Sequence, residues 1–249
     1  MPLFSLSLAV RGSVLLLLLE TQGWFNMENR LRESHLNFLG KLLAGYTHEL
    51  KNHLAIINES SGLMDDLLGM SAGGDERLYT RLRRIAAAIS ERVSSANTMA
   101  MYLNRVAHRM DFPLSHCNLN DLLIEELALM ERFSAMKKIS FEKSLQKEIP
   151  SIYNNPALLQ FIVFSLVNDL IEKLGSGSVI EFFSCANDDN VEVRIESAGP
   201  FDSACELSDS GQMFQILNFA AEKIDITLNQ TSSEGQFIKN IIKVPIKTG

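Results

Sequence analysis

The sequence predicts a long helical hairpin followed by an α+β domain. Between residues 28 and 110, apolar residues recur every three or four positions, which is the spacing of amphipathic helices. A glycine-rich segment at 69–75 interrupts this pattern once. After Pro113, shorter helical patterns alternate with strand-like runs, as expected for a sheet that carries helices on one face.

The two helices of the hairpin are expected at residues 28–70 and 76–110. A hairpin with one wide apolar stripe cannot bury that stripe alone, so two copies are expected to form a four-helix bundle. Small residues at 86–88 and 94–96 of the second helix allow close approach. The first helix carries a near-heptad apolar seam of Leu36, Leu39, Leu43, Tyr46, Leu50, Leu54, Ile57, Met64 and Leu68.

The α+β domain is expected to run in the order helix, strand, helix, two strands, helix, two strands. Its first two helices have clear starts, because Asn118 can cap the first and a proline follows Asn155 in the second. The helices are expected at 118–136, 156–174 and 211–223, and the strands at 138–145, 179–186, 191–197, 224–231 and 237–246.

Composition excludes several classes of function. The net charge is −7 and no strongly basic run occurs, so nucleic acid is not an expected partner. Cys117, Cys185 and Cys205 are scattered and form no CxxC pair, so neither a disulfide framework nor a zinc site is indicated. A reducing cytoplasm is the simplest location.

Residues 1–26 carry two apolar patches separated by Arg11 and Gly12. Their length falls short of the about 20 apolar residues that a membrane-spanning helix needs. A poor signal peptide and a membrane-associated segment both remain open. We favour a third interpretation, translation from Met27, because a polar run begins there, and we separate residues 1–27 from the fold. An intact mass of the native protein that includes residues 1–26 would contradict this interpretation.

The most informative stretch reads His48-Glu49-Leu50-Lys51-Asn52-His53-Leu54, in the middle of the first helix. His48 falls off the apolar seam, so its side chain is expected to face solvent. An exposed histidine beside a carboxylate can act as a nucleophile, because a hydrogen bond can orient one ring nitrogen while the other attacks. The alternative is an ordinary solvated pair with no chemical role.

This stretch resembles the phospho-acceptor box of two-component sensor histidine kinases. The resemblance implies that His48 is the phospho-acceptor and Glu49 the general base of autophosphorylation. It also implies that Asn52, with Glu49, orients water to dephosphorylate a receiver domain. His53 stands where the family usually has proline, and we interpret it as structural, with a second acceptor as the alternative.

The resemblance covers about residues 30–249. The order of elements after the hairpin is similar to the ATP-binding domain of histidine kinases, a fold shared with gyrase and a heat-shock chaperone. The resemblance thus implies a dimerisation and phospho-acceptor domain at 28–112 and an ATPase-type domain at 113–249.

The nucleotide-binding motifs of the family match less well. The family's Asn-x-x-x-Asn pattern aligns with Phe164 and Asn168, so only the magnesium-binding asparagine remains. The Asp-x-Gly-x-Gly loop aligns with Ser197, Gly199 and Phe201. One glycine of the next glycine-rich motif remains, and the segment that would form an ATP lid is short. The retained positions imply Asn168, Gly199 and Gly211 as ATP contacts and Asn168 as the magnesium ligand.

These departures count against ATP and magnesium as cofactors, and we expect a degenerate ATPase domain. A serine lacks the charge that strengthens the bond to the adenine amino group, and Phe201 would crowd the pocket. Asn168 and Gly199 then have an equally good interpretation as ordinary cap or turn residues.

Three functions stay open. The first, which we favour, is a cytoplasmic homodimer that is phosphorylated on His48 and exchanges phosphoryl groups with a response-regulator aspartate, or dephosphorylates it. The second is a divergent, active ATP-dependent sensor kinase. The third is a non-catalytic dimeric scaffold. Contact with a membrane through residues 1–26 stays open in all three.

Overall fold

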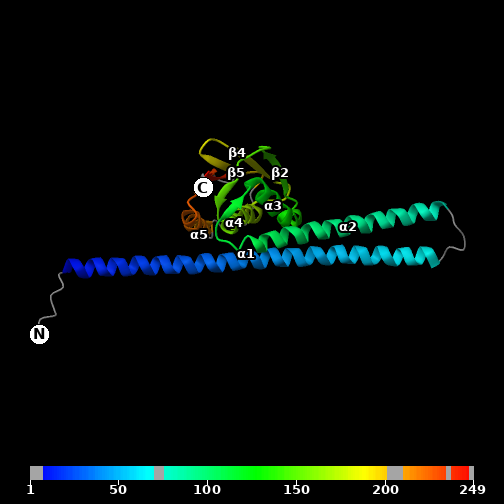
Figure 1. Ribbon diagram of the computed structural model, residues 1–249, viewed down its shortest axis with the longest axis horizontal. Coiled ribbons are helices and arrows are strands. Elements are labelled where there is room, and N and C mark those ends of the chain that lie inside the picture. The colour runs from blue at the N-terminus through cyan, green and yellow to red at the C-terminus, as the bar shows by residue number, and fades with distance from the viewer. Residues whose placement is uncertain (1–7, 70–75, 201–209, 234–236, 247–249) are drawn as a thin grey trace, which may run out of the picture.

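The computed structural model describes residues 8–69, 76–200, 210–233 and 237–246. Two long helices, α1 (Leu8–Gly69) and α2 (Glu76–His108), lie side by side, and a compact α+β domain sits against one side of them (Figure 1). The helices of that domain lie between its sheet and α1, so the molecule has three layers where the domain sits.

The α+β domain contains a five-stranded mixed sheet in the order β2-β4-β5-β7-β6. Only the pair β2 and β4 is parallel, and the other pairs are antiparallel. Two short strands, β1 and β3, pair separately. The elements are β1 (Ser115–Cys117), α3 (Leu119–Met136), β2 (Ser140–Leu145), β3 (Ile152–Asn154), α4 (Pro156–Lys173), β4 (Val179–Ala186), β5 (Asn190–Ala198), α5 (Ser210–Lys223), β6 (Thr227–Ser233) and β7 (Phe237–Pro245).

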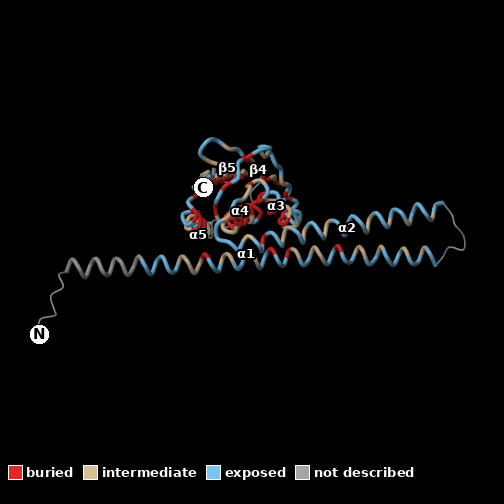
Figure 2. Tube along the Cα trace, viewed as in Figure 1, coloured by how far each residue is buried: buried red, intermediate tan, exposed pale blue. Residues whose placement is uncertain are grey.

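The predicted hairpin and α+β domain are confirmed, and local signals explain the helix starts. The side chain of Asn118 accepts hydrogen bonds from the backbone of Asn120 and Asp121, and that of Asn155 accepts one from Leu158. These contacts satisfy backbone donors that the first helical turn leaves free. Figure 2 shows the buried residues gathered between the helices and the sheet of this domain.

Three details of the prediction are wrong. Helix α1 begins at Leu8 rather than residue 28, because residues 8–27 contain no proline and isolated glycines cost a helix only about 1 kcal/mol each. Strand β1 was not predicted, since three residues carry too little pattern. Strand β6 begins at Thr227 rather than 224, because the residues after α5 form a turn in which Asp225 has φ 54°. Residues 70–75 of the predicted loop lie outside the described part of the chain.

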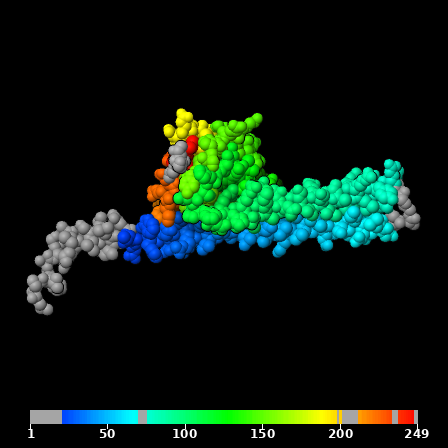
Figure 3. Space-filling view, viewed as in Figure 1, coloured from blue at the N-terminus to red at the C-terminus, as the bar shows by residue number. Residues whose placement is uncertain are grey.

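Helix α1 packs across α4 and α5 with a face that differs from the predicted seam. Phe38 is 2% exposed, and its ring lies 4.8 Å from that of Phe164 on α4. Leu31 and Leu42 are also buried. The space-filling view shows this part of α1 in contact with the domain above it (Figure 3). The seam residues Leu36, Leu43, Leu54 and Leu68 are exposed.

Polar contacts flank this apolar contact. Lys41 Nζ lies 3.2 Å from Glu172 Oε1 at the end of α4, and Arg30 donates to the Gln212 amide oxygen of α5 at 3.2 Å. Trp24 meets Phe219 of α5 edge to face, with ring centroids 6.1 Å apart. Helix α1 is therefore joined to the α+β domain over several turns.

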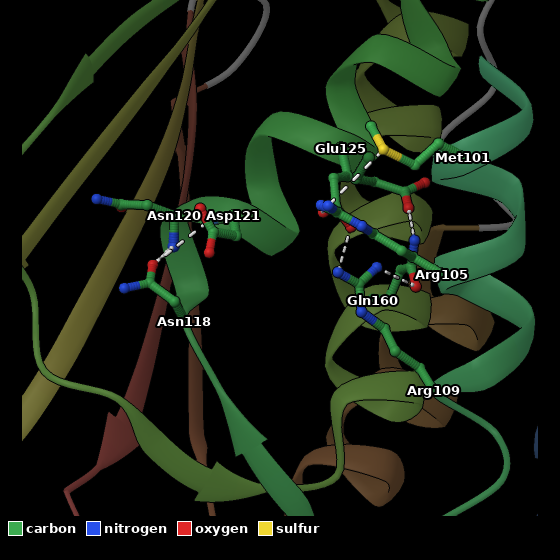
Figure 4. Close-up of polar contacts among 9 residues, drawn as sticks. Met101, Arg105, Arg109, Asn118, Asn120, Asp121, Glu125 and Gln160 are labelled. Carbon is green, nitrogen blue, oxygen red and sulfur yellow. Dashed lines mark hydrogen bonds and ion pairs between the residues drawn. The ribbon is translucent and has the colours of Figure 1, made fainter. Parts of the chain in front are cut away.

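A buried ionic network joins the end of α2 to the same domain (Figure 4). Arg105 and Arg109 of α2 both pair with Glu125 of α3, whose side chain is 3% exposed. Arg109 also donates to the Gln160 amide oxygen of α4 at 3.2 Å. Gln160 in turn donates to Glu126 Oε2 at 2.5 Å. Both helices of the hairpin are thus fixed to the domain.

This network predicts a pH-dependent stability. Burial raises the pKa of the Glu126 carboxyl from 4.5 to about 8, although the Gln160 amide and the Arg109 charge act to lower it. Between these two values the folded chain keeps a proton that the unfolded chain has lost. The free energy of unfolding therefore falls as pH rises through this window, by at most about 1.4 kcal/mol per unit, and levels off above it. Urea denaturation at pH 5 and pH 8 should show this loss in the wild type and a smaller loss in Glu126→Gln.

The matched control is Glu131→Gln, because Glu131 lies on the same helix and is exposed. It should keep the wild-type pH dependence. An equal pH dependence in Glu126→Gln and the wild type would contradict the assignment to Glu126.

Candidate functional site

The helical turn of α1 that carries His48, Glu49 and Asn52, the predicted acceptor turn, lies where α3 comes close to α1. Gly45 is buried one turn before His48, and a Cβ added to it would lie 2.9 Å from Cζ of Phe133 on α3. Gly45, Glu49 and His53 follow at four-residue spacing, so they share the face of α1 that turns toward α2 and α3. His48 lies to one side of that face and is exposed.

Asn52 joins the two chemically active groups of this turn. Its amide nitrogen Nδ2 donates to Glu49 Oε2 at 3.3 Å and lies 3.3 Å from Nδ1 of His48. These contacts arise because residues three and four apart are neighbours on a helix. The structure thus brings together the three predicted residues His48, Glu49 and Asn52, and the contact with Asn52 orients the His48 ring through Nδ1.

His53 lies on the buried side of the same turn. It is 5% exposed, and its Nε2 lies 4.0 Å from Glu49 Oε1. Its Nδ1 is buried and has no hydrogen-bond partner among the described residues. A pocket of about 630 Å³ opens beside it between α1, α2 and α3. The interpretation of His53 as structural overlooked its contact with Glu49, although their four-residue spacing indicates it.

The predicted magnesium ligand Asn168 is hydrogen-bonded within α4 through its amide nitrogen. Its amide Nδ2 donates to Glu172 Oε1 at 2.6 Å. Phe164, one turn earlier, is buried beneath Phe38. A pocket of about 500 Å³ borders Asn168, but α1 forms one of its walls with Arg30 and Lys41. The face of α4 that carries Asn168 is therefore covered by α1.

The adenine-binding position is also occupied by contacts within the protein. Ser197 is 1% exposed, and its hydroxyl donates to the Ile238 carbonyl at 3.2 Å and accepts from the Ile238 amide at 3.1 Å. Both hydrogen bonds belong to the pairing of β5 with β7, so this hydroxyl is not available to a purine. Phe201 and most of the predicted lid segment lie outside the described residues.

The two remaining glycines give no support for a nucleotide. Gly199 has φ +136°, and an added Cβ would lie 2.4 Å from Ser178 Oγ and 2.9 Å from Ser178 Cα. Packing inside the domain alone therefore requires this glycine. At Gly211 an added Cβ would meet nothing within 4 Å. Ser197 and Gly199 are thus accounted for by contacts within the domain, and neither supplies a contact for ATP.

No group of three or more His, Cys, Asp or Glu side chains is placed to hold a metal ion in the part of the chain that the structure describes. Nor is any helix, within those same limits, long and apolar enough to cross a membrane.

Two curated relatives are similar to about two thirds of this chain. Sporulation kinase A of Bacillus subtilis (strain 168) is 23% identical over 176 residues, which cover 69% of this chain. Sensor histidine kinase ZraS of Escherichia coli (strain K12) is 23% identical over 168 residues, which cover 68% of this chain. The chain is related to the two-component sensor histidine kinases. The predicted resemblance to these kinases is confirmed.

The likeness has limits. The chain spans 27% and 34% of the length of these two relatives. No family model matches it. Among solved structures, histidine kinase ThkA in complex with response regulator protein TrrA covers 90% of this chain and 66% of that chain, at 19% identity and a TM-score of 0.44.

Proposed function

We propose that this chain is a histidine phosphotransfer protein of two-component signalling, in which His48 exchanges a phosphoryl group with the aspartate of a response-regulator receiver domain. The contact of Asn52 with both His48 and Glu49 is the observation that carries this proposal. It places an exposed nucleophile, a carboxylate and an amide on one helical turn, where a partner can reach them.

The transfer step follows from this geometry. Phosphoryl transfer depends mainly on positioning and on electrostatic stabilisation. A ring nitrogen of His48 forms a P–N bond while the P–O bond to the receiver aspartate breaks. The reactive nitrogen is Nε2, because Nδ1 faces Asn52. Attack by Nε2 requires the proton on Nδ1, so the exposed His48 ring must turn its Nδ1–H from Asn52 to water, while the Asn52 amide keeps its hydrogen bond to Glu49.

Hydrolysis of the receiver phosphate is the second reaction that the turn supports. Glu49 can take a proton from water, and the Asn52 amide can orient that water. The water oxygen bonds to phosphorus as the bond to the receiver aspartate breaks, which releases inorganic phosphate. Neither reaction needs ATP in this chain, in keeping with the poor fit of Asn168 and Ser197 to a nucleotide.

Two further proposals concern partners. We propose that the chain is a homodimer, because large apolar side chains on the described part of the hairpin are exposed, and that the receiver domain docks beside His48. A reducing cytoplasm suits the two described cysteines, which are free thiols. The exposed apolar residues of the hairpin include Leu36, Leu43, Leu54, Leu68, Val93 and Met101.

Transfer from a labelled receiver domain tests the proposal. Receiver domains from the same organism, phosphorylated on aspartate with ³²P, are mixed with the full chain without ATP. Label should move to the chain, survive base, and be lost in acid. His48→Ala should remove it, with a loss of at least about a hundredfold, because no other group replaces the nucleophile.

His108→Ala is the matched control for this experiment. His108 is also an exposed histidine beside a carboxylate, since its Nδ1 lies 2.8 Å from Asp111 Oδ2. It is the last residue of α2 and does not belong to the acceptor turn of α1. It should keep full transfer. Failure of every receiver domain to transfer label to the wild type would favour the scaffold instead.

A further inference from the structure

His53 contacts the acceptor turn from its buried side, where the family usually has a proline without an ionisable group. We propose that His53 is a positioning residue that makes the reactivity of Glu49 depend on pH. This inference rests on the proposed function, and it assigns to His53 control over hydrolysis of the receiver phosphate.

Four side chains on α1 form a continuous series. His53 Nε2 lies 4.0 Å from Glu49 Oε1, while Glu49 Oε2 accepts from Asn52, which contacts His48. The two carboxylate oxygens of Glu49 therefore face two different groups. A distance of 4.0 Å is too long for a hydrogen bond of a neutral imidazole, but it suits an ion pair once the imidazole is charged.

The surroundings of His53 leave room for a partner at its second ring nitrogen. An unpartnered buried nitrogen costs free energy, yet Nδ1 of His53 lacks a partner among the described residues. The adjoining pocket of about 630 Å³ is large enough for water to supply that partner and a proton. Histidine is the side chain whose charge ordinarily changes between pH 5 and pH 8.

The charged groups around the imidazole come from three helices. Glu49 lies on α1, Glu91 on α2, and Glu131 and Arg132 on α3, all lining the same pocket. Glu91 and Glu131 are exposed, so their charges are strongly screened by water. The Glu49 carboxylate lies 4.0 Å from the ring, within ion-pair distance, and it is the group that His53 acts on.

Hydrolysis of the receiver phosphate should slow when His53 becomes charged. With His53 neutral, Glu49 is free to take the proton of the attacking water as the bond from phosphorus to the receiver aspartate breaks. With His53 charged, the imidazolium pairs with Oε1 and draws the carboxylate toward the pocket, away from the attacking water. Hydrolysis should therefore slow as the solution becomes acidic.

The test follows hydrolysis of a ³²P-labelled receiver domain by the full chain at pH 5.5, 6.5, 7.5 and 8.5, with the rate of the receiver alone subtracted. The wild-type rate should fall roughly fivefold or more from pH 8.5 to 5.5, the range in which histidine changes charge. In His53→Gln, which cannot become charged, the fall should be less than about twofold. His108→Gln should follow the wild type.

A second measurement holds even if His53→Gln folds poorly. The ring nuclei of His53 are titrated by NMR in the wild type and in Glu49→Gln, and the titration midpoint should move to lower pH when the carboxylate is removed. An unchanged midpoint, or equal pH profiles of His53→Gln and the wild type, would overturn the inference.

These outcomes are distinct from failure of the proposed function. If the wild type neither transfers nor hydrolyses the receiver phosphate at any pH, the proposed function fails and the inference fails with it. If transfer to His48 is present in the same samples but the pH profile does not depend on residue 53, only the role of His53 is wrong.

Discussion

Replacing Phe38 with alanine is expected to lower the free energy of unfolding by about 3–5 kcal/mol, the usual cost of removing a buried phenylalanine ring. Phe38 is 2% exposed, and its ring lies 4.8 Å from Phe164 and 5.9 Å from Phe161. Removal leaves a cavity at the centre of the contact between α1 and α4. Urea denaturation measures the loss, followed by circular dichroism and by tryptophan fluorescence.

Trp24 makes this experiment specific to the contact between the two parts of the molecule. It is the single tryptophan of the chain, and it meets Phe219 of α5. In the wild type the two signals should change together, because α1 and the domain unfold as one unit. In Phe38→Ala the fluorescence should change at lower urea. Glu33→Ala, an exposed change on the same helix, should stay within about 0.5 kcal/mol of the wild type. If both signals of Phe38→Ala still change together and at the same urea concentration as in the wild type, this ring does not fix α1 to the domain.

Replacing Arg109 with methionine is expected to destabilise the chain by about 3–5 kcal/mol, because it leaves a buried carboxylate without its best-buried partner. The Arg109 side chain is 14% exposed and the Glu125 side chain 3% exposed. Arg105, the other partner of Glu125, is 52% exposed, so water solvates its charge. Urea denaturation at pH 7 gives the measurement.

A double-mutant cycle separates the lost pair from lost packing. Arg105→Met should cost less than half as much as Arg109→Met, since its guanidinium is largely solvated. Adding Glu125→Leu to Arg109→Met should recover much of the loss, because an apolar pair of similar size often replaces a buried ion pair without penalty. Additive losses in the double variant would contradict the importance of the buried charge.

Local signals made most of the fold predictable. Asn118 and Pro156 mark helix starts by hydrogen bonding and by backbone geometry, which act within one turn. The choice of the buried face of α1 was not predictable in this way. Phe38 and Leu42 lie off the heptad seam, and their burial depends on α4 and α5, which are far away in the sequence.

In the candidate site, too, local contacts were predictable and long-range contacts were not. The spacing of His48, Glu49 and Asn52 is enough to make them neighbours on a helix, so their contacts were predictable. Residue type alone suggested that Ser197 lacks the charge of the family's adenine-binding residue, whereas Gly199 matched the family motif and was predicted as an ATP contact. The hydrogen bonds of Ser197 to Ile238 and the approach of Ser178 to Gly199 depend on strand pairing and chain packing that no local pattern records.

The source of the phosphoryl group on His48 tests the central claim most directly. The full chain is incubated in parallel with magnesium and γ-labelled ATP, and with a labelled, phosphorylated receiver domain, each with His48→Ala beside it. Acid-labile, base-stable label that comes from the receiver, is absent with ATP and disappears in His48→Ala is the predicted result. Label that comes from ATP alone and disappears in the same variant would contradict it, because an active kinase must open the contact between α1 and α4 that covers Asn168.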